Sequence, residues 1–367
     1  MWLQEIEADR LRNLKAVSLS LPAGLSVVTG RNAQGKTSLL EAIYLLATGR
    51  SFRTRKLEEL IARNGGPLRV AGEFSGRIGR SKLAVFLDEG SRRLLADEIE
   101  KDPASYIGRL DIVDLTAERM NVVRGAPLER RRFLDRGVVG LRPDYLREIG
   151  EYRRVLAQRN ALLRRGGQAR PEELDVWDER LRLAAVALHG ARRQYAVLLG
   201  TRLGEVTRAV LPDGQELRLI YRPSPAESEA AAPDRFGEVF DAALARGRRR
   251  DLEVGHTCLG PHRDDLVVEL QGVDLRRYGS AGQVRAAMIA LKLGKLSMLR
   301  EERGESPLFL MDDFDTDLDE VRASALAGFL KDGGFQALVA TSKEALLREL
   351  GVAFMKLRMD DGVARAA

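Results

Sequence analysis

One eight-residue segment constrains the fold of this chain more than any other part of the sequence. Residues Gly30 to Thr37 spell G-R-N-A-Q-G-K-T, which matches the phosphate-loop pattern G-x-x-x-x-G-K-[ST] at every fixed position. A strand-like run at 25–29 precedes it, and residues 37–48 follow with apolar side chains at helical spacing. Backbone N–H groups and a helix N-terminus together make a cradle for anions. The sequence therefore predicts an α/β core in which a strand, a phosphate loop and a helix follow one another.

Each residue type in the loop has a task in such a site. The glycines let the backbone turn closely around phosphate. Lys36 is expected to reach the β and γ phosphates, and the Thr37 hydroxyl is placed for Mg²⁺. A chance glycine-rich turn before a helix is the alternative, but it does not explain the matching flanks. We therefore predict that ATP binds at Gly30, Arg31, Asn32, Ala33, Gln34, Gly35, Lys36, Thr37 and Ser38.

A second, independent motif follows a buried-type strand near the end of the chain. Four apolar residues at 308–311 lead directly into Asp312 and Asp313. A strand that ends in carboxylates presents them at the edge of the sheet, so Asp312 is expected to hold Mg²⁺ and Asp313 to orient or deprotonate the attacking water. An acidic loop without catalytic function is the alternative, because aspartates are dense between 312 and 319.

A third motif precedes the helix expected after Gly282. Residues 278–283 spell Y-G-S-A-G-Q, about 30 residues before Asp312. This segment resembles the signature sequence of ABC-type ATPases, whose heads pair so that the signature of one covers the γ phosphate bound by the other. The resemblance implies that Ser280, in trans, and Gln283 contribute to catalysis. A glycine turn that caps a helix is the alternative.

Three further segments narrow the resemblance to one family. They are G-R-S-F-R at 49–53, G-A-P-L-E-R-R-R-F-L-D at 125–135 and G-P-H-R-D-D at 260–265. With the motifs above, the chain resembles the RecF family, ABC-type ATPases of bacterial recombination, over nearly all of 1–360. The resemblance implies a weak, DNA-stimulated ATPase that forms an ATP-dependent homodimer and binds double-stranded or gapped DNA. It also implies RecO and RecR as partners and RecA loading in recombinational repair and replication restart as the outcome.

The chain departs from the family pattern at several positions. Ala33 stands where many relatives have glycine, and Asp313 is shorter than the glutamate common among ABC-type ATPases, so slow hydrolysis is expected. Thr316-Asp317 replaces Ser-Glu, and no glutamine near 113–118 supplies a Q-loop. Two alternatives therefore remain open: a DNA-binding scaffold that does not hydrolyse ATP, and an ABC-type ATPase of another kind.

Helical texture between two α/β segments indicates an insertion. The predicted fold is an ABC-type ATPase head with a β-rich N-terminal part plus an inserted, mostly helical lobe. The head is expected to comprise 1–126 and 251–367, and the lobe 127–250. Within the lobe, a helical run at 128–165 and a second at 172–210 meet at a glycine turn and predict an antiparallel hairpin.

The basic residues are concentrated rather than evenly spread. The chain carries a net charge of +6, yet thirteen arginines and five acidic residues give 121–170 a net charge of +8. A charge of this size attracts phosphate, and the low aromatic content argues against stacking on single strands. We predict duplex backbone contacts by Arg130, Arg131, Arg132, Arg153 and Arg154, although a solvated helix face is the ordinary alternative.

The remaining composition excludes other classes. Cys258 is the only cysteine, so no intrachain disulfide or cysteine-based zinc site can form. No apolar run approaches the roughly 20 residues that span a bilayer, and the N-terminus is unlike a secretory signal. We therefore expect a cytoplasmic, nucleoid-associated protein with no membrane partner. His262 is expected to serve a structural role within 260–265 rather than to bind a metal.

Overall fold

The computed structural model describes residues 1–62, 65–77, 79–88, 90–116, 122–166, 170–210, 215–313 and 320–367. Contacts divide the chain into two compact units. Unit 1 comprises Met1–Met120, Arg202–Glu216 and Ala281–Ala367, and unit 2 comprises Asn121–Thr201 and Leu217–Ser280. No helix among the described residues is both long and apolar enough to cross a membrane.

The N-terminal part of unit 1 is an antiparallel sheet in the order β2-β1-β4-β5-β6-β7. Its inward-facing side chains alternate with exposed ones, as in β5, where Leu83, Val85 and Leu87 are buried. The sequence predicts strands at 68–74 and 82–87, and the structure adds β6 to them. The bounds are β1 Trp2–Asp9, β2 Val17–Ser20, β4 Leu68–Gly76, β5 Gly79–Asp88, β6 Ser91–Ala96 and β7 Ile99–Glu100.

The second sheet of unit 1 has the order β15-β14-β3-β13-β12-β8 and is parallel except for β15. All residues of β12 and β13 are buried, as expected for strands covered on both faces. The strands are β3 Leu25–Thr29, β8 Ile112–Leu115, β12 Leu308–Met311, β13 Ala337–Thr341, β14 Met355–Asp360 and β15 Val363–Ala366. The carboxyl ends of β3 and β12 therefore lie at the same edge, which brings the phosphate loop and Asp312 together.

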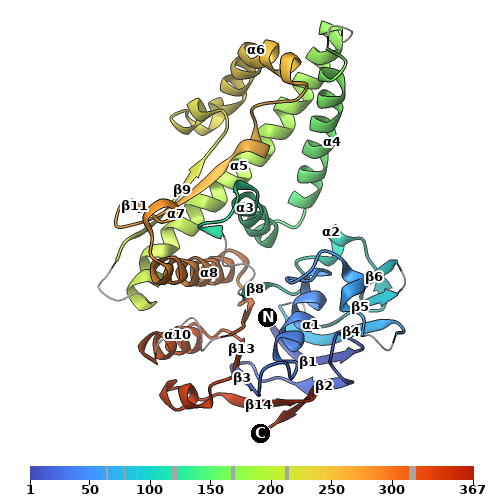
Figure 1. Cartoon of the computed structure of the whole chain (residues 1–367), viewed down its shortest axis with the longest axis vertical. Helices are drawn as coiled ribbons and strands as arrows, with labels where there is room; N and C mark the ends of the chain where they lie inside the picture. Colours follow the sequence, from blue (N-terminus) through green and yellow to red (C-terminus); the bar gives the residue numbers. More distant parts are fainter. Residues whose placement is uncertain are drawn as a thin grey trace. The chain divides into compact units, whose positions relative to one another are not determined.

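Helices cover both faces of this parallel sheet (Figure 1). Helices α8 and α10 lie on one side, and α1 on the other side packs between the parallel and the antiparallel sheets. Because α1 is enclosed in this way, eleven of its thirteen residues are buried, rather than one apolar face. The elements are α1 Lys36–Thr48, α2 Pro103–Tyr106, α8 Ala281–Arg303, α10 Glu320–Asp332 and the short helices η1 Leu57–Leu60 and η8 Glu344–Glu349.

Unit 2 is mostly helical and carries a small antiparallel sheet in the order β11-β10-β9. Helices α4 and α5 run side by side (Figure 1), and Leu162, Leu163 and Leu174 pack together near the turn that joins them. The predicted helical hairpin is therefore present. The helices are α3 Pro127–Leu141, α4 Tyr145–Leu163, α5 Pro171–Val210, α6 Phe236–Val254, α7 Leu275–Tyr278, η5 Ala226–Glu229, η6 Pro233–Arg235 and η7 Pro261–Arg263; the strands are β9 Leu217–Arg222, β10 Asp265–Leu270 and β11 Val273–Asp274.

Two features differ from the sequence prediction. The expected helical run at 128–165 is two helices, because Pro143 cannot continue α3 and restricts Arg142 before it to an extended conformation. The domain boundaries also differ: 251–280, expected in the head, lies in unit 2, because β10 pairs along its length with β9. Conversely, the end of α5 at 202–210 belongs to unit 1.

Candidate functional site

The phosphate loop has the backbone geometry that close contact with an anion requires. Gly30 and Gly35 have φ values of 150° and 111°, which favour glycine. A Cβ on Gly30 would lie 2.4 Å from the carbonyl oxygen of Met359, so β14 leaves room there for glycine alone. Ala33 also has a positive φ of 64°, a left-handed conformation that glycine adopts without strain.

Two predicted nucleotide ligands lie at the start of α1. The Lys36 ammonium donates to the carbonyl oxygens of Gly30 and Arg31 at 2.8 and 3.0 Å, so it lies across the mouth of the loop. The Thr37 hydroxyl lies beside the Asp312 carboxyl at the end of β12 and lowers its pKa. The structure thus brings together the two residues predicted to hold Mg²⁺, and a hydroxyl beside a carboxylate supplies the hard oxygen ligands that this ion prefers.

The two aspartates after β12 differ in environment. Burial raises the pKa of the Asp312 carboxyl, and repulsion by Asp313 adds to this effect, while the Thr37 hydroxyl, the Asp313 N–H and Lys36 oppose it. Asp313 is exposed, and its backbone N–H donates to Asp312 Oδ1 at 3.1 Å. A divalent cation beside Asp312 would offset both unfavourable effects, because it stabilises the ionised carboxylate. The neighbouring segment Thr316–Asp319, which the sequence also singled out, lies outside the described residues.

A cavity of about 510 Å³ opens in front of the loop. Six of the nine predicted loop residues line it, as does Asp313. Gly30, Arg31 and Gln34 are not among its lining residues. The cavity is lined by Arg12, Asn13, Asn32, Ala33, Gly35, Lys36, Thr37, Ser38, Arg53 and Asp313.

Arg12 and Asn13 are lining residues that sequence reasoning missed, and Arg53 was noted only as part of a family motif. Asn13 donates to the Ala33 carbonyl at 3.0 Å and accepts from the Ser38 hydroxyl at 2.8 Å, so it ties the loop to the N-terminal sheet. No local pattern around these residues marks them, because the contacts connect segments far apart in the chain.

A fully buried carboxylate on α1 holds the two arginines of the cavity. Glu41 accepts from Arg12 Nε at 2.5 Å and Nη2 at 3.0 Å, and Arg53 Nη1 lies 3.6 Å from it. The Ser51 hydroxyl also donates to Glu41 Oε1, at 2.5 Å. The G-R-S-F-R segment therefore places Arg53 at the nucleotide cavity through a charge buried in α1.

The C-terminal hairpin supports the loop from the opposite end of the sequence. The Asp361 N–H donates to the side-chain oxygen of Gln34 at 2.5 Å. The Gly362 N–H donates to the backbone carbonyl of Gln34 at 3.0 Å. Gly362 has a positive φ, and a Cβ there would lie 2.0 Å from the Asn13 carbonyl oxygen. Gln34 thus serves the loop by fixing its conformation.

The signature segment is exposed. Ser280 is the last residue of unit 2, and Gln283 lies in the first turn of α8. Both residues are exposed, and the neighbouring Tyr278 is 73% exposed. Neither Ser280 nor Gln283 is among the residues that line the phosphate-loop cavity. Their roles in catalysis remain predictions.

The structure separates the arginines that the sequence grouped as DNA contacts. Arg130 is only 2% exposed and its guanidinium pairs with Asp265, so the expectation that it contacts DNA is wrong for this conformation. Arg131 Nη1 donates to the Asp264 carbonyl at 2.9 Å, and Arg132 pairs with Glu129. Arg153 and Arg154 are exposed on α4, where Arg154 pairs with Glu151 at 2.7 Å.

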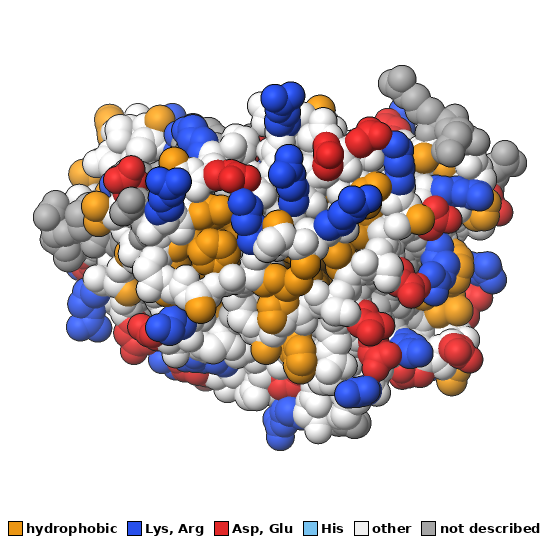
Figure 2. Space-filling model, turned by 90° about the horizontal axis from the view of Figure 1, so that it is seen from below, with side chains coloured by type: hydrophobic (Ala, Val, Ile, Leu, Met, Phe, Trp, Pro, Cys, Tyr) orange, Lys and Arg blue, Asp and Glu red, His pale blue; other side chains and the backbone are white. Residues whose placement is uncertain are grey.

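A second group of arginines, on α6, is also partly neutralised. Arg246 pairs with Glu227, and Arg248 with Asp175 and Asp178. On the face in Figure 2, Lys and Arg side chains gather along one side of a central group of hydrophobic side chains, with Asp and Glu side chains around them. Surface charge of both signs is therefore interspersed on that face. The ion pairs of Arg130, Arg132 and Arg248 show in addition that net charge over a sequence window overstates the free positive surface.

The parallel sheet, the phosphate loop and the adjoining aspartates define an ABC-type ATPase head. A family model described as the RecF/RecN/SMC N-terminal domain matches residues 2–365. Heads of Smc proteins share the fold, with a TM-score of 0.59 for a head bound to the C-terminal winged-helix domain of ScpA, at 15% identity.

Proteins with higher sequence identity to this chain identify one family within this group. The DNA replication and repair protein RecF of Geobacillus thermodenitrificans is 31% identical over 95% of both chains, and that of Myxococcus xanthus is 34% identical over 95% of this chain and 92% of the relative. A structure of the recombination mediator RecF with ATP superimposes with a TM-score of 0.89 at 28% identity, covering 100% of this chain and 97% of that one. The chain belongs to the RecF family.

Proposed function

We propose that this protein is an ATP-dependent, DNA-binding recombination mediator. The observation that carries the proposal is the cavity in which Lys36 lies across the phosphate loop and the Thr37 hydroxyl lies beside the Asp312 carboxyl. Two features add support: relatives that match nearly the whole chain are DNA replication and repair proteins, and one solved neighbour is a recombination mediator bound to ATP.

The residues of the cavity have different roles in ATP hydrolysis. Lys36 leaves the Gly30 and Arg31 carbonyls for the β and γ phosphates, while the loop N–H groups hold the remaining oxygens. Thr37 and Asp312 would hold Mg²⁺, which would supply positive charge to offset that of the phosphates. Asp313, exposed at the cavity, accepts a proton from the water that attacks the γ phosphorus, giving ADP and phosphate. Its short side chain makes hydrolysis slow, and we propose that DNA stimulates it.

The exposed signature requires a second chain. Ser280 and Gln283 complete the nucleotide site of the partner in a head-to-tail homodimer, where the serine hydroxyl and the start of α8 face the γ phosphate. Both chains then contact each ATP, so ATP binding favours the dimer and ATP hydrolysis allows the two chains to separate. This accounts for the exposure of Tyr278 and Ser280 in the single chain.

DNA contacts the dimer through arginines of unit 2 that remain accessible. Arg153 and Arg154 on α4 are the principal candidates, and Arg131 and Arg132 contribute where they are partly exposed. Contacts of this kind hold the phosphate backbone of duplex or gapped DNA and read little sequence. Membership of the RecF family leads us to propose RecO and RecR as partners, RecA loading as the outcome and the cytoplasmic nucleoid as the place of action.

Sedimentation of the chain with and without ATP and gapped duplex DNA tests the proposal. We expect a monomer alone, a dimer with ATP, and a dimer–DNA complex only when both are present. Arg153→Glu with Arg154→Glu should weaken the complex and leave the dimer intact, whereas Arg249→Glu with Arg250→Glu, two exposed residues on α6, serves as the matched charge control. Equal DNA binding with and without ATP contradicts the proposal, and a DNA-bound dimer without single-turnover hydrolysis identifies a scaffold instead.

A further inference from the structure

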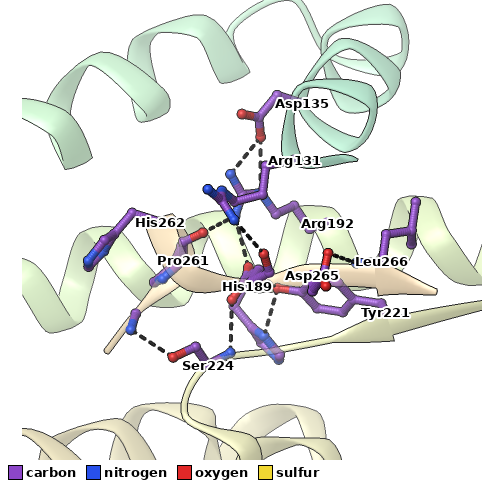
Figure 3. Close-up of polar contacts among 12 residues, drawn as sticks. Arg131, Asp135, His189, Arg192, Tyr221, Ser224, Pro261, His262, Asp265 and Leu266 are labelled. Carbon is purple, nitrogen blue, oxygen red and sulfur yellow. Dashed lines mark hydrogen bonds and ion pairs between the residues drawn. The ribbon is translucent and has the colours of Figure 1, made fainter. Parts of the chain in front are cut away.

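The G-P-H-R-D-D segment at 260–265, of which Figure 3 labels Pro261, His262 and Asp265, does not line the nucleotide cavity. Its first aspartate, Asp264, is among the most tightly held groups of unit 2. Asp264 is 1% exposed and accepts from Arg192 Nη1 at 2.8 Å, the Tyr221 hydroxyl at 2.5 Å and the Ser224 N–H at 2.9 Å. Arg192 also donates to the Pro261 carbonyl at 2.6 Å. The loop is therefore fixed to α5 and β9.

The next residue, Asp265, makes a different set of contacts. Its carboxylate pairs with Arg130 of α3, which donates through Nε and, at 2.9 Å, through Nη2. Arg276 Nη1 of α7 donates to the same carboxylate at 3.3 Å. Burial opposes ionisation of Asp265, but these arginines and the Leu266 N–H hold its pKa below the ordinary value, so it is an anion at neutral pH.

Arg276 is four residues before Ser280. Its helix, α7, begins at Leu275 and is capped by Asp274, whose side chain accepts from the Arg276 N–H at 2.9 Å. The Arg276 side chain thus donates to Asp265 and also, through Nη2 at 3.3 Å, to Asp274, which holds its backbone as well.

A second arginine reaches the residue directly before Ser280. The Arg124 guanidinium donates to the Gly279 carbonyl. A Cβ on Gly279 would lie 2.7 Å from the Leu275 carbonyl oxygen, so the chain turns tightly here and its carbonyl direction is restricted. Arg124 and Arg276 therefore hold the signature segment from two sides.

We propose that Arg124 and Arg276, the latter through Asp265, are positioning residues that set the location of Ser280 for the nucleotide of the partner chain. The inference rests on the proposed function, because it requires that Ser280 acts in trans. It also reassigns part of the arginine-rich region: Arg124 and Arg130 bind groups of this chain rather than DNA.

The two positioning residues can be changed without opening a core. The Arg276 side chain is 33% exposed and Arg124 is exposed, so water can replace their lost contacts. Arg130 is unsuitable for this test, because its removal would leave Asp265 without its main partner inside unit 2. Loss of Arg124 and Arg276 should therefore loosen Ser280 while unit 2 remains folded.

The test compares the double variant Arg124→Ala/Arg276→Ala with the wild type. Light scattering measures ATP-driven dimerisation, and a fluorescent ATP analogue measures nucleotide binding to the monomer. We expect dimerisation to weaken by about tenfold or more, which corresponds to the loss of one charge-assisted hydrogen bond, and nucleotide affinity to stay within about twofold. Arg276→Lys should restore part of the loss, and Arg277→Ala, a neighbour 66% exposed and 3.9 Å from Asp274, should behave like the wild type.

Other outcomes separate this inference from the proposed function. If Ser280→Arg blocks dimerisation while the double variant dimerises normally, the positioning role is wrong and the trans role of Ser280 stands. If the double variant loses nucleotide affinity and thermal stability together with dimerisation, its arginines maintain the fold and the inference is also wrong. If the wild type does not dimerise with ATP, the proposed function fails and this inference fails with it.

Discussion

Removal of the Arg192 guanidinium should destabilise unit 2 more than any exposed substitution. Arg192 is 4% exposed and donates to Asp135 at 2.8 and 2.9 Å, to Asp264 at 2.8 Å and to the Pro261 carbonyl (Figure 3). The variant Arg192→Met keeps much of the apolar stem but leaves two carboxylates without their cation. Breaking a buried pair in this way costs about 3–5 kcal/mol, which corresponds to a fall in Tm of about 10–20 °C for a unit of this size.

The pH dependence of that loss gives a sharper test. Burial already raises the pKa of Asp264, and Arg192 opposes this rise. Without Arg192 the carboxyl pKa rises further, so protonation relieves part of the cost and the difference in Tm between variant and wild type should shrink as the pH falls from 7 toward 5.

Thermal unfolding followed by circular dichroism at several pH values measures both effects. Arg154→Met is the matched control, because it removes an exposed guanidinium paired with Glu151 on α4 and should leave Tm unchanged within error. A loss below about 1 kcal/mol for Arg192→Met, or one independent of pH, would refute the assignment of this network as the anchor of the loop.

Two further predictions concern buried groups in the two units. Glu41→Gln removes the charge that holds Arg12 and Arg53, so ATP affinity measured by calorimetry should fall by about tenfold; the exposed control Glu58→Gln should bind normally, and equal affinity in both would contradict the role of Glu41. Burial lowers the pKa of His189 from 6.5 to about 4, with Arg193 and Arg192 adding to the shift. The unfolded state therefore takes up a proton first, and the stability present above pH 6.5 is lost toward pH 4 by up to about 1.4 kcal/mol per pH unit. His189→Phe, which preserves stacking on Phe236, should flatten this decline in hydrogen-exchange stability of unit 2, and an unchanged slope would show that His189 does not titrate in this way.

The parts of the site that the sequence predicted are those coded by adjacent residues. The phosphate loop and the aspartates after β12 follow from spacing within one strand, one turn and one helix, and parallel pairing brings them to one edge of the sheet. The residues that support the phosphate loop and the cavity could not be predicted in this way. Glu41 accepts a hydrogen bond from Arg12, and the Gln34 side chain accepts one from the Asp361 N–H. These residues are far apart in the sequence and meet only in the folded chain.

The arginines illustrate the same limit for function. A local net charge identified the region but did not show which guanidinium groups have internal partners. Arg130 pairs with Asp265, which lies 135 residues later in the chain. Arg192, which no motif marked, pairs with Asp135 and Asp264 in a buried ionic network of unit 2. Sequence charge therefore located the arginine-rich region, but it did not distinguish the buried Arg130 from the exposed Arg153 and Arg154.

The most direct test of the central claim, a nucleotide site shared between two chains, mixes two inactive variants. Lys36→Ala removes the lysine of the phosphate loop, and Ser280→Arg obstructs the signature, so neither should dimerise alone with ATP. A mixed head-to-tail dimer combines the intact phosphate loop of one variant with the intact signature of the other. Light scattering should therefore detect an ATP-dependent dimer only in the mixture. Normal dimerisation of Ser280→Arg alone, or no dimer in the mixture, would contradict the shared site.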